Sequence, residues 1–428
     1  MLTLLLLCAL NDPPNIVVLL ADDLGWADVG WHRSEIPTPR LDGLAEAGAK
    51  LEAFYVQPVC SPTRAALLTG RYPMRHGLQV GVVRPWARYG LPLEERTLPD
   101  ALREAGYATS ICGKWHLGHH EPAYLPTRRG FDHQYGHYNG AIDYFTHDRD
   151  GGFDWHRNDA ACRDDGYSTH LIAKEAAQVV RTHAGKKPFF LYVAFNAVHA
   201  PHQAPERYME PFAAMKGERR KYAGMLAALD EAVGTIVDAV DQAGVRENTL
   251  FLFSSDNGGP TPVANNGPLR AGKGTLYEGG VRVPAFASWK GRIPAGSVVD
   301  QPLHMVDWYP TLLKLAGAKL EQKLPVDGRD AWTTIAQGAP SPHDDLLLNT
   351  EPEAGALRAG DWKLVVKGTS AELYDLKDDP FEKRDRAAEK PEKVKELRER
   401  LDGYARQAVA PKSAPKPKNF ASPKVWGE

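Results

Sequence analysis

The sequence predicts an α/β fold: a mostly parallel sheet flanked by helices, followed by a small C-terminal α+β domain that contains an antiparallel sheet. Three continuous apolar runs, at residues 15–21, 189–195 and 249–255, are typical of strands buried on both faces of a parallel sheet. Between the runs lie amphipathic stretches such as 97–105 and 222–243, with apolar side chains at helical spacing. This alternation of strand and helix indicates a parallel α/β sheet.

The pattern of predicted secondary structure changes after about Leu346. Short strand candidates at residues 361–366 and 372–376 read as an antiparallel sheet, and a charged helix is predicted at 390–406. We therefore divide the chain into a possible leader or extension at 1–14, a catalytic domain at 15–339 and a small C-terminal domain at 340–428. The Pro- and Lys-rich residues 411–428 fit either a disordered tail or a strap packed through Phe420 and Trp426.

Composition excludes several classes of protein. Apolar residues make up 43% and charged residues 25% of the 428, which is typical of a globular protein. The net charge of −2 argues against a nucleic-acid partner, so an anionic ligand would need a local cluster of cations. The four cysteines are widely spaced without a C-x-x-C pair, which argues against a zinc site and a dense disulfide framework. The apolar start is too short to span a membrane, and it fits a weak export signal as well as a plain extension.

The most informative segment is VCSPTRAALLTGRYP at residues 59–73. Its Cys-x-Pro-x-Arg pattern, followed by a helix and Thr-Gly-Arg, resembles the signature of the sulfatase family, in which the cysteine is oxidised to formylglycine. The five-residue pattern alone would also fit a buried structural cysteine at a helix start. The resemblance implies that Cys60 supplies a hydrated aldehyde, with one hydroxyl to attack sulfur and a second to expel sulfate afterwards. Arg64, one helical turn on, is expected to hold that group by hydrogen bonds.

Acidic and amide side chains follow two of the predicted strands. Asp22 and Asp23 come directly after the first strand, and Asp256 and Asn257 follow a late one. In open α/β sheets the ligand site lies outside the carboxyl ends of the strands. These residues supply only oxygen ligands, which suit Ca²⁺, or alternatively Mg²⁺, better than zinc. The Ala-Asp-Asp-x-Gly and Asp-Asn-Gly-Gly patterns resemble sulfatase blocks, which implies that these four residues and the modified Cys60 hold the ion.

Four further cationic or titratable residues match sulfatase blocks. The resemblance implies that Lys114 binds the sulfate oxygens and that His116 is the partner of the hydrated aldehyde. It also implies that His199 acts on the leaving alkoxide and that Lys273 shares this role. His202 has no counterpart in the family and remains a candidate for a substrate or supporting contact.

The resemblance extends over nearly the whole chain and leans toward the arylsulfatase B, or N-acetylgalactosamine-4-sulfatase, type. It implies an alkaline-phosphatase-like fold, a sulfated saccharide of the glycosaminoglycan kind as substrate, and a formylglycine-generating enzyme as maturation partner. It also implies periplasmic or secreted localisation, with no nucleic-acid partner and no membrane span. Segments after Phe153 and Pro325 look shorter than in animal members, so the exact sugar does not transfer.

Two other functions fit part of the pattern. The chain could be a phosphonate or phosphate monoester hydrolase of the same superfamily, or a non-catalytic binder of sulfated glycans if Cys60 stays unmodified. Near the expected mouth, a sugar could stack on Trp86 between Arg84 and Arg88, but a packed surface tryptophan is the slightly favoured interpretation. His304 is expected to be structural.

Overall fold

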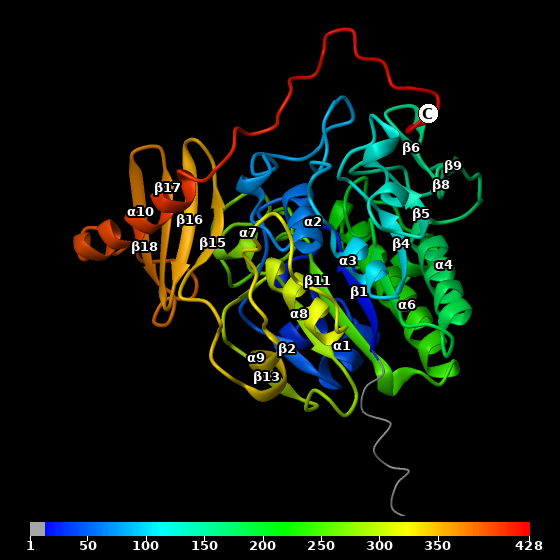
Figure 1. The fold of residues 1–428 in the computed structure, drawn as a ribbon, viewed down its shortest axis with the longest axis horizontal. Coiled ribbons are helices and arrows are strands. Elements are labelled where there is room, and N and C mark those ends of the chain that lie inside the picture. The colour runs from blue at the N-terminus through cyan, green and yellow to red at the C-terminus, as the bar shows by residue number, and fades with distance from the viewer. Residues whose placement is uncertain (1–12) are drawn as a thin grey trace, which may run out of the picture.

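Strand β1 (Asn15–Ala21) lies at the centre of a large mixed sheet, in a computed structural model that describes residues 13–428 (Figure 1). All seven of its residues are buried. The strands of this sheet, in spatial order, are β13 (Ser297–Val299), β2 (Ala49–Leu51), β12 (Ala285–Ser288), β11 (Thr249–Ser255), β1, β10 (Phe189–Ala194), β4 (Ala108–Lys114), β5 (His133–His137), β8 (His156–Arg157) and β9 (Ala160–Ala161). Nearly all of the predicted leader lies outside the described residues.

The centre of the sheet is parallel, as the buried apolar runs predicted. Strands β11, β1, β10, β4 and β5 pair in parallel, whereas β12, β8 and β9 add antiparallel partners toward the two edges. The register aligns Ala21 with Ser255, and Ala194 with Gly113. The carboxyl ends of β1, β11, β10 and β4 therefore meet at one edge of the sheet.

Helices cover both faces of the sheet because alternate residues of each strand point to opposite sides. Ile16, Val18 and Leu20 share one core with α2 (Cys60–Thr69), α3 (Leu98–Glu104) and α8 (Trp308–Leu315). Val17 and Leu19 share the other with α1 (Pro39–Glu46), α4 (Ser168–His183) and α6 (Gly217–Gln242). Both predicted helices form, as α3 and α6.

The smaller elements connect these layers. The remaining helices are α5 (Glu206–Met209), α7 (Glu278–Val281) and α9 (Trp332–Gln337), and two small pairs of strands join β3 (Phe54–Tyr55) with β14 (Leu303–His304) and β6 (Asp148–Arg149) with β7 (Gly152–Phe153). Short 3-10 helices are η1 (Trp26–Asp28), η2 (Gly30–His32), η3 (Pro73–Arg75), η4 (Pro122–Tyr124), η5 (Pro126–Arg128), η6 (Glu210–Phe212), η7 (Arg246–Asn248) and η8 (Met305–Asp307).

A second, antiparallel sheet lies at one end of the molecule (Figure 1). It consists of β15 (Leu346–Thr350), β16 (Ala354–Ala359), β17 (Trp362–Lys367) and β18 (Ser370–Asp375), and α10 (Pro391–Ala405) packs against it. A buried ion cluster joins this sheet to α7: Lys363 Nζ lies 2.8 Å from both Glu278 Oε1 and Glu382 Oε1. All three side chains are almost completely buried, so the positive charge of the lysine must offset the negative charges of the two glutamates. The predicted small α+β unit is therefore present, whereas its boundary at residue 340 stays a prediction.

The C-terminal residues 411–428 lie across the molecule as a strap, the second of the two alternatives. In Figure 1 the strap runs from α10 across the top of the molecule to the region of β6. Its end is held by the amide of Trp426, which donates to Phe153 O at 2.9 Å, and by the buried Trp426 side chain. Near its start, Lys412 N donates to Gly77 O at 2.7 Å.

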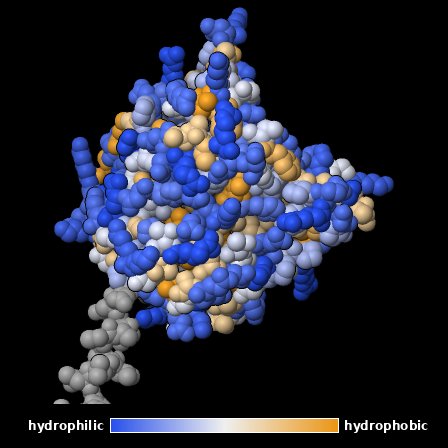
Figure 2. Space-filling model, turned by 90° about the vertical axis from the view of Figure 1, so that its right-hand side faces the viewer, coloured by the Kyte–Doolittle hydropathy of each residue, from blue (hydrophilic) through white to orange (hydrophobic). Residues whose placement is uncertain are grey.

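The outer surface is mostly polar. Figure 2 shows a predominantly hydrophilic face on the side of α4, with apolar areas scattered rather than gathered into one patch. Across residues 13–428, none of the helices combines the length and apolarity that crossing a bilayer would require. The three cysteines within that range, Cys60, Cys112 and Cys162, are unpaired thiols.

Candidate active site

The candidate site lies at the carboxyl edge of the parallel strands. Asp22 and Asp23 follow β1, Asp256 follows β11, Lys114 ends β4, and His199 lies in the turn after β10. The register places these strand ends side by side, and the backbone amide of Asp23 donates to Asp256 Oδ1 at 3.3 Å. The fold thus brings together residues that lie more than 230 positions apart in the sequence.

Cys60 is the first residue of α2, where unpaired amide groups and the helix dipole favour an anion. Its Sγ lies 3.6 Å from Asp22 Oδ1, and the residue is 2% exposed. Burial raises the pKa of the Cys60 thiol to about 12, and nearby Asp256 adds to this effect. The unmodified thiol is therefore protonated at neutral pH and is a poor nucleophile.

Three buried carboxylates face three cations around Cys60. Lys114 Nζ lies 2.5 Å from Asp22 Oδ2, and Lys273 Nζ lies 2.6 Å from Asp23 Oδ1. Arg64 Nη2 lies 2.8 Å from Asp256 Oδ2, and its Nη1 donates to Lys114 O at 3.1 Å. The charges of the protein groups thus balance, so a bound divalent cation would leave the site positive and ready for an anionic substrate.

The pKa values of the paired groups reflect this arrangement. Burial opposes ionisation of Asp22, but the charges of Lys114 and His199 lower its pKa below the ordinary value. Burial likewise opposes ionisation of Asp23, whose pKa His199 and Lys273 lower. Burial alone would lower the pKa of Lys273, but the neighbouring Cys60 and Asp23 raise it instead. These groups therefore stay charged at neutral pH despite their burial.

Burial lowers the pKa values of the two candidate histidines. Burial lowers the pKa of His116 well below its usual range, and Lys114 lowers it further. Burial also lowers the pKa of His199, with Asp23 acting in the opposite direction. His116 Nε2 lies 3.0 Å from Val83 O while its Nδ1 has no partner, and His199 Nε2 lies 3.7 Å from Asp23 Oδ2.

Two residues of the site hold a strained backbone. Asp23 has φ 66° and His116 has φ 59°, in the left-handed region that residues other than glycine seldom adopt. Such strain persists only where the surrounding structure fixes it, and it concentrates at functional sites. Behind His116, Gly140 leaves room for the ring, because a Cβ there would lie 2.3 Å from His116 Cε1.

The donor set suits a hard cation. Ligand atoms of Asp22, Asp23, Cys60 and His199 lie within 4.8 Å of one another. The amide of Asn257 donates from Nδ2 to Asp23 Oδ1 at 2.7 Å, and its Oδ1 is buried without a partner. Three carboxylates and an unpartnered amide oxygen match the oxygen-rich ligand sets of Ca²⁺ and Mg²⁺. His199 joins this cluster, although the sequence assigned it to the leaving group rather than to the metal.

Other singled-out residues lie in structural contacts. His202 Nδ1 lies 2.8 Å from Glu218 Oε2, so its contact is with α6. His304 is fully buried and accepts from Val306 N at 3.2 Å, as expected of a structural histidine. Trp86 Nε1 donates to Ala414 O at 2.8 Å, and the side chain is partly buried against the C-terminal strap.

Sequence reasoning missed the role of Ser61. Its Oγ donates to His116 O at 2.9 Å and accepts from Val83 N at 3.0 Å. One hydroxyl therefore joins α2, the His116 turn and the loop after Gly81. The only available signal was the position of Ser61 inside the Cys60 motif.

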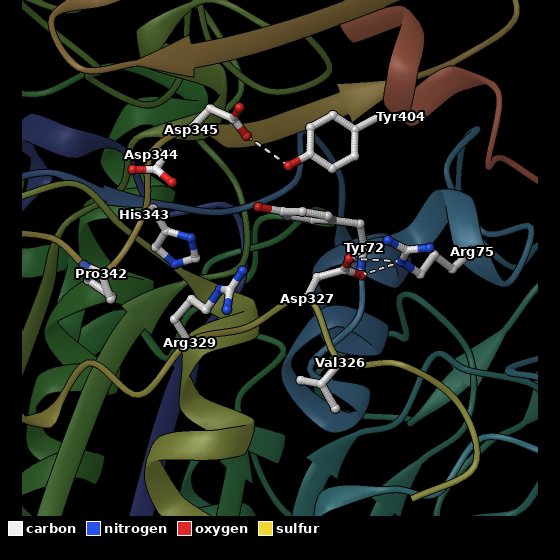
Figure 3. A pocket seen from close by; sticks show the side chains of 10 residues that line it. All are labelled: Tyr72, Arg75, Val326, Asp327, Arg329, Pro342, His343, Asp344, Asp345 and Tyr404. Atoms are coloured by element: carbon white, nitrogen blue, oxygen red, sulfur yellow. Dashed lines mark hydrogen bonds and ion pairs between the residues drawn. The ribbon is translucent and has the colours of Figure 1, made fainter. Parts of the chain in front are cut away.

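A separate polar hollow of about 370 Å³ lies at the junction with the small sheet (Figure 3). Several of its polar groups are paired with one another: Arg75 Nη2 lies 2.7 Å from Asp327 Oδ1, and Tyr404 donates to Asp345 Oδ1 at 2.7 Å. None of the residues gathered around Cys60 lines it. It is a junction between structural units rather than part of the candidate active site.

The fold and the charged site at the strand ends define a class, the alkaline-phosphatase-like α/β hydrolases. The sulfatase family model matches residues 14–318. Arylsulfatase J of Mus musculus is 38% identical, over 97% of this chain and 80% of that protein. N-acetylgalactosamine-6-sulfatase of Rattus norvegicus is 37% identical, over 78% of this chain and 68% of that protein. The chain belongs to the sulfatase family, whose members are sulfuric ester hydrolases.

A solved structure supports the same assignment. The structure of Ps i-CgsB in complex with k-i-k-neocarrahexaose superposes with a TM-score of 0.88 and 34% identity, and the match covers 94% of each chain. The predicted family, enzyme class and fold class are therefore confirmed.

Proposed function

We propose that this sulfatase hydrolyses sulfate monoesters of a saccharide of the glycosaminoglycan kind, through a formylglycine formed from Cys60 and with one bound Ca²⁺. The observation that carries the proposal is the position of Cys60 at a helix start, with Sγ 3.6 Å from Asp22, among three carboxylates and three cations. Relatives named for N-acetylgalactosamine-6-sulfate and a structure named with a neocarrahexaose support a sulfated saccharide as substrate.

Each side chain has a task that follows from its contacts. Asp22, Asp23, Asp256 and Asn257, with residue 60, would hold the Ca²⁺, which when bound supplies positive charge to the sulfate oxygens. A formylglycine hydrate at position 60 would supply the nucleophilic oxygen and a route back to the aldehyde. Mg²⁺ is the alternative ion.

The remaining groups bind and orient the ester. Lys114 and Lys273, which pair with Asp22 and Asp23, are placed to bind sulfate oxygens once the carboxylates face a cation. Arg64 fixes Asp256 and the main chain at Lys114. His116, whose Nδ1 has no partner, would accept a proton from the hydrate, and the partly exposed His199 would polarise or protonate the leaving alkoxide.

The proposed function is tested by rates on three esters that share one leaving group. Aryl sulfate should be hydrolysed with a much larger kcat/KM than the aryl phosphate or the aryl ester of phenylphosphonate, because the chain belongs to a family of sulfuric ester hydrolases. A large preference for the phosphonate would instead identify the alternative, a phosphonate monoester hydrolase. All three rates should be measured on one preparation, so that the fraction of Cys60 converted to formylglycine cancels in the comparison.

The non-catalytic alternative is decided by mass spectrometry of the Cys60 peptide. Conversion of the thiol to the aldehyde lowers the peptide mass by about 18 Da. We expect this shift in protein from its native host, where a formylglycine-generating enzyme acts as maturation partner in an exported, periplasmic or secreted protein. An unshifted peptide together with saccharide binding would indicate a glycan binder.

Chelation should abolish most of the activity. Removing the ion leaves Lys114 and Lys273 paired with Asp22 and Asp23 rather than free for sulfate, so we expect a loss of about 100-fold or more in kcat/KM. Adding Ca²⁺ back should restore the rate and raise the thermal midpoint, because a ligand that binds the folded state stabilises it. The double variant D22N/D23N should show no Ca²⁺-dependent rise. A metal-stripped sample with an unchanged rate and midpoint would remove these residues from the ligand set.

A further inference from the structure

A pocket of about 380 Å³ opens between the loop after Val83 and the C-terminal strap. Its walls come from both segments and include Trp86, Arg88, Phe420, Trp426 and Glu428. The two segments are more than 320 positions apart, yet Trp86 Nε1 donates to Ala414 O at 2.8 Å. The strap that crosses the molecule in Figure 1 therefore forms one wall of this pocket.

Aromatic rings from both segments line the pocket. The Trp86 and Phe420 rings meet edge to face with centroids 5.9 Å apart, and Phe420 stacks on Trp426 at 6.3 Å. The Trp86 and Phe420 side chains are only partly buried, so ring surface remains open to the pocket. An aromatic wall with a few polar groups is the usual lining of a site for an organic ligand.

The charges of the pocket favour an anion at one end. Within residues 13–428, the pocket-lining Arg88 forms no ion pair and is exposed, and so is Lys416, which lies next to the lining residue Pro417. Lys416 Nζ lies 5.5 Å from the ring centroids of both Trp86 and Phe420. Glu428 also lines the pocket, where its carboxylate can accept hydrogen bonds from hydroxyl groups. The set therefore suits a ring that carries hydroxyls and one anionic substituent.

The pocket lies beside the candidate active site. Val83 bonds to that site at both of its main-chain groups: its amide to Ser61 Oγ, and its carbonyl to His116 Nε2, each at 3.0 Å. Pro85, which lines the pocket, is two residues farther on, at most about 7 Å along the chain. The loop after Val83 therefore contacts Ser61 and His116 at its start and lines the pocket two residues farther on, so the pocket and the candidate active site share this loop.

We propose that this pocket binds the sugar ring next to the sulfated one, in an oligosaccharide whose sulfate lies at Cys60. Trp86 and Phe420 contact the ring, and Arg88 binds an anionic substituent on it. This inference rests on the proposed function and adds to it a preference for oligosaccharides over isolated esters. The strap therefore contributes side chains to the substrate site in addition to packing against the catalytic domain.

The proposal is tested by the kcat/KM for a sulfated oligosaccharide divided by the kcat/KM for 4-nitrophenyl sulfate. The aryl ester carries no second sugar, so it reports the active site without the pocket. The oligosaccharide is the better substrate of two probes, a chondroitin sulfate tetrasaccharide and a carrageenan tetrasaccharide. Arg88→Ala should lower the ratio about tenfold, the effect of losing one charge-assisted hydrogen bond. Phe420→Ala should lower it about threefold to tenfold. Arg88→Lys should recover part of the loss.

The matched control is Lys418→Ala, an exposed strap lysine that does not line the pocket, for which the ratio should stay unchanged. Calorimetry gives a second readout without catalysis: in a Cys60→Ala background, Arg88→Ala should weaken tetrasaccharide binding about tenfold. A constant ratio and a constant Kd across Arg88→Ala and Phe420→Ala overturn the pocket while leaving the proposed function intact. Arg88-dependent binding in a fully converted protein that hydrolyses neither ester overturns the proposed function and keeps the pocket.

Discussion

Replacing Cys60 by alanine is expected to lower kcat/KM for an aryl sulfate by about 10³-fold or more. The reason is that no other side chain in the site can supply a nucleophilic oxygen that regenerates itself. Cys60 is small and buried, so loss of its Sγ should change the free energy of unfolding by only about 1 kcal/mol. Steady-state kinetics and urea unfolding of the same preparation check both statements.

The matched control is Cys162→Ala, the same chemical change at a half-buried thiol outside the site. It should keep wild-type activity. Retained hydrolysis in Cys60→Ala would reassign the nucleophile, whereas equal losses in both variants would point to a general effect of cysteine removal. Cys60→Ser adds a graded comparison, because serine offers one hydroxyl where the hydrate offers two.

Lys363→Met is expected to lower the free energy of unfolding by about 3–5 kcal/mol. The side chain is fully buried and is 2.8 Å from both Glu278 and Glu382, so its removal leaves two buried carboxylates without their shared cation. In the folded wild type this cation lowers the pKa of Glu278, whereas burial raises the pKa of Glu382. Thermal and urea unfolding at neutral pH measure the loss.

The pH dependence of that loss distinguishes electrostatics from lost packing. Without Lys363 the two carboxylates titrate at a higher pKa in the folded state than in the unfolded state. A raised folded pKa makes stability fall as pH rises, so the deficit of the variant should shrink between about pH 7 and pH 5. A deficit independent of pH would indicate packing alone. Lys377→Met, an exposed lysine near the same sheet, is the control and should change stability by less than about 0.5 kcal/mol.

The centre of the fold was predictable because it depends on burial. Runs such as residues 15–21 are apolar on both faces, and only the middle of a covered parallel sheet accepts such strands. The flanking strands were not predicted. β4 contains the polar or small residues Thr109, Ser110 and Gly113, which interrupt its apolar pattern. β2 and β13 are only three residues long, which is too short to show a periodicity.

The candidate site was predictable to the extent that its residues lie in recognisable blocks. Asp22, Cys60, Lys114 and Lys273 do, and the structure brings them together. The pairing of each carboxylate with one cation was not predictable, because it depends on register between distant strands. The contacts of Ser61 with His116 and the pocket wall formed by the strap were not predictable for the same reason: both depend on residues that are far apart in the sequence.

The burial of Cys60 also bears on the order of events during biosynthesis. The residue is 2% exposed and its Sγ lies 3.6 Å from the buried Asp22, so the active site of a second enzyme cannot reach it in the finished fold. Under the proposed function, oxidation must therefore precede closure of the sheet, while the segment around residue 60 is still an accessible peptide. The active fraction of a preparation is then set by competition between folding rate and modification rate in the producing cell, and no later treatment of the folded protein should raise it.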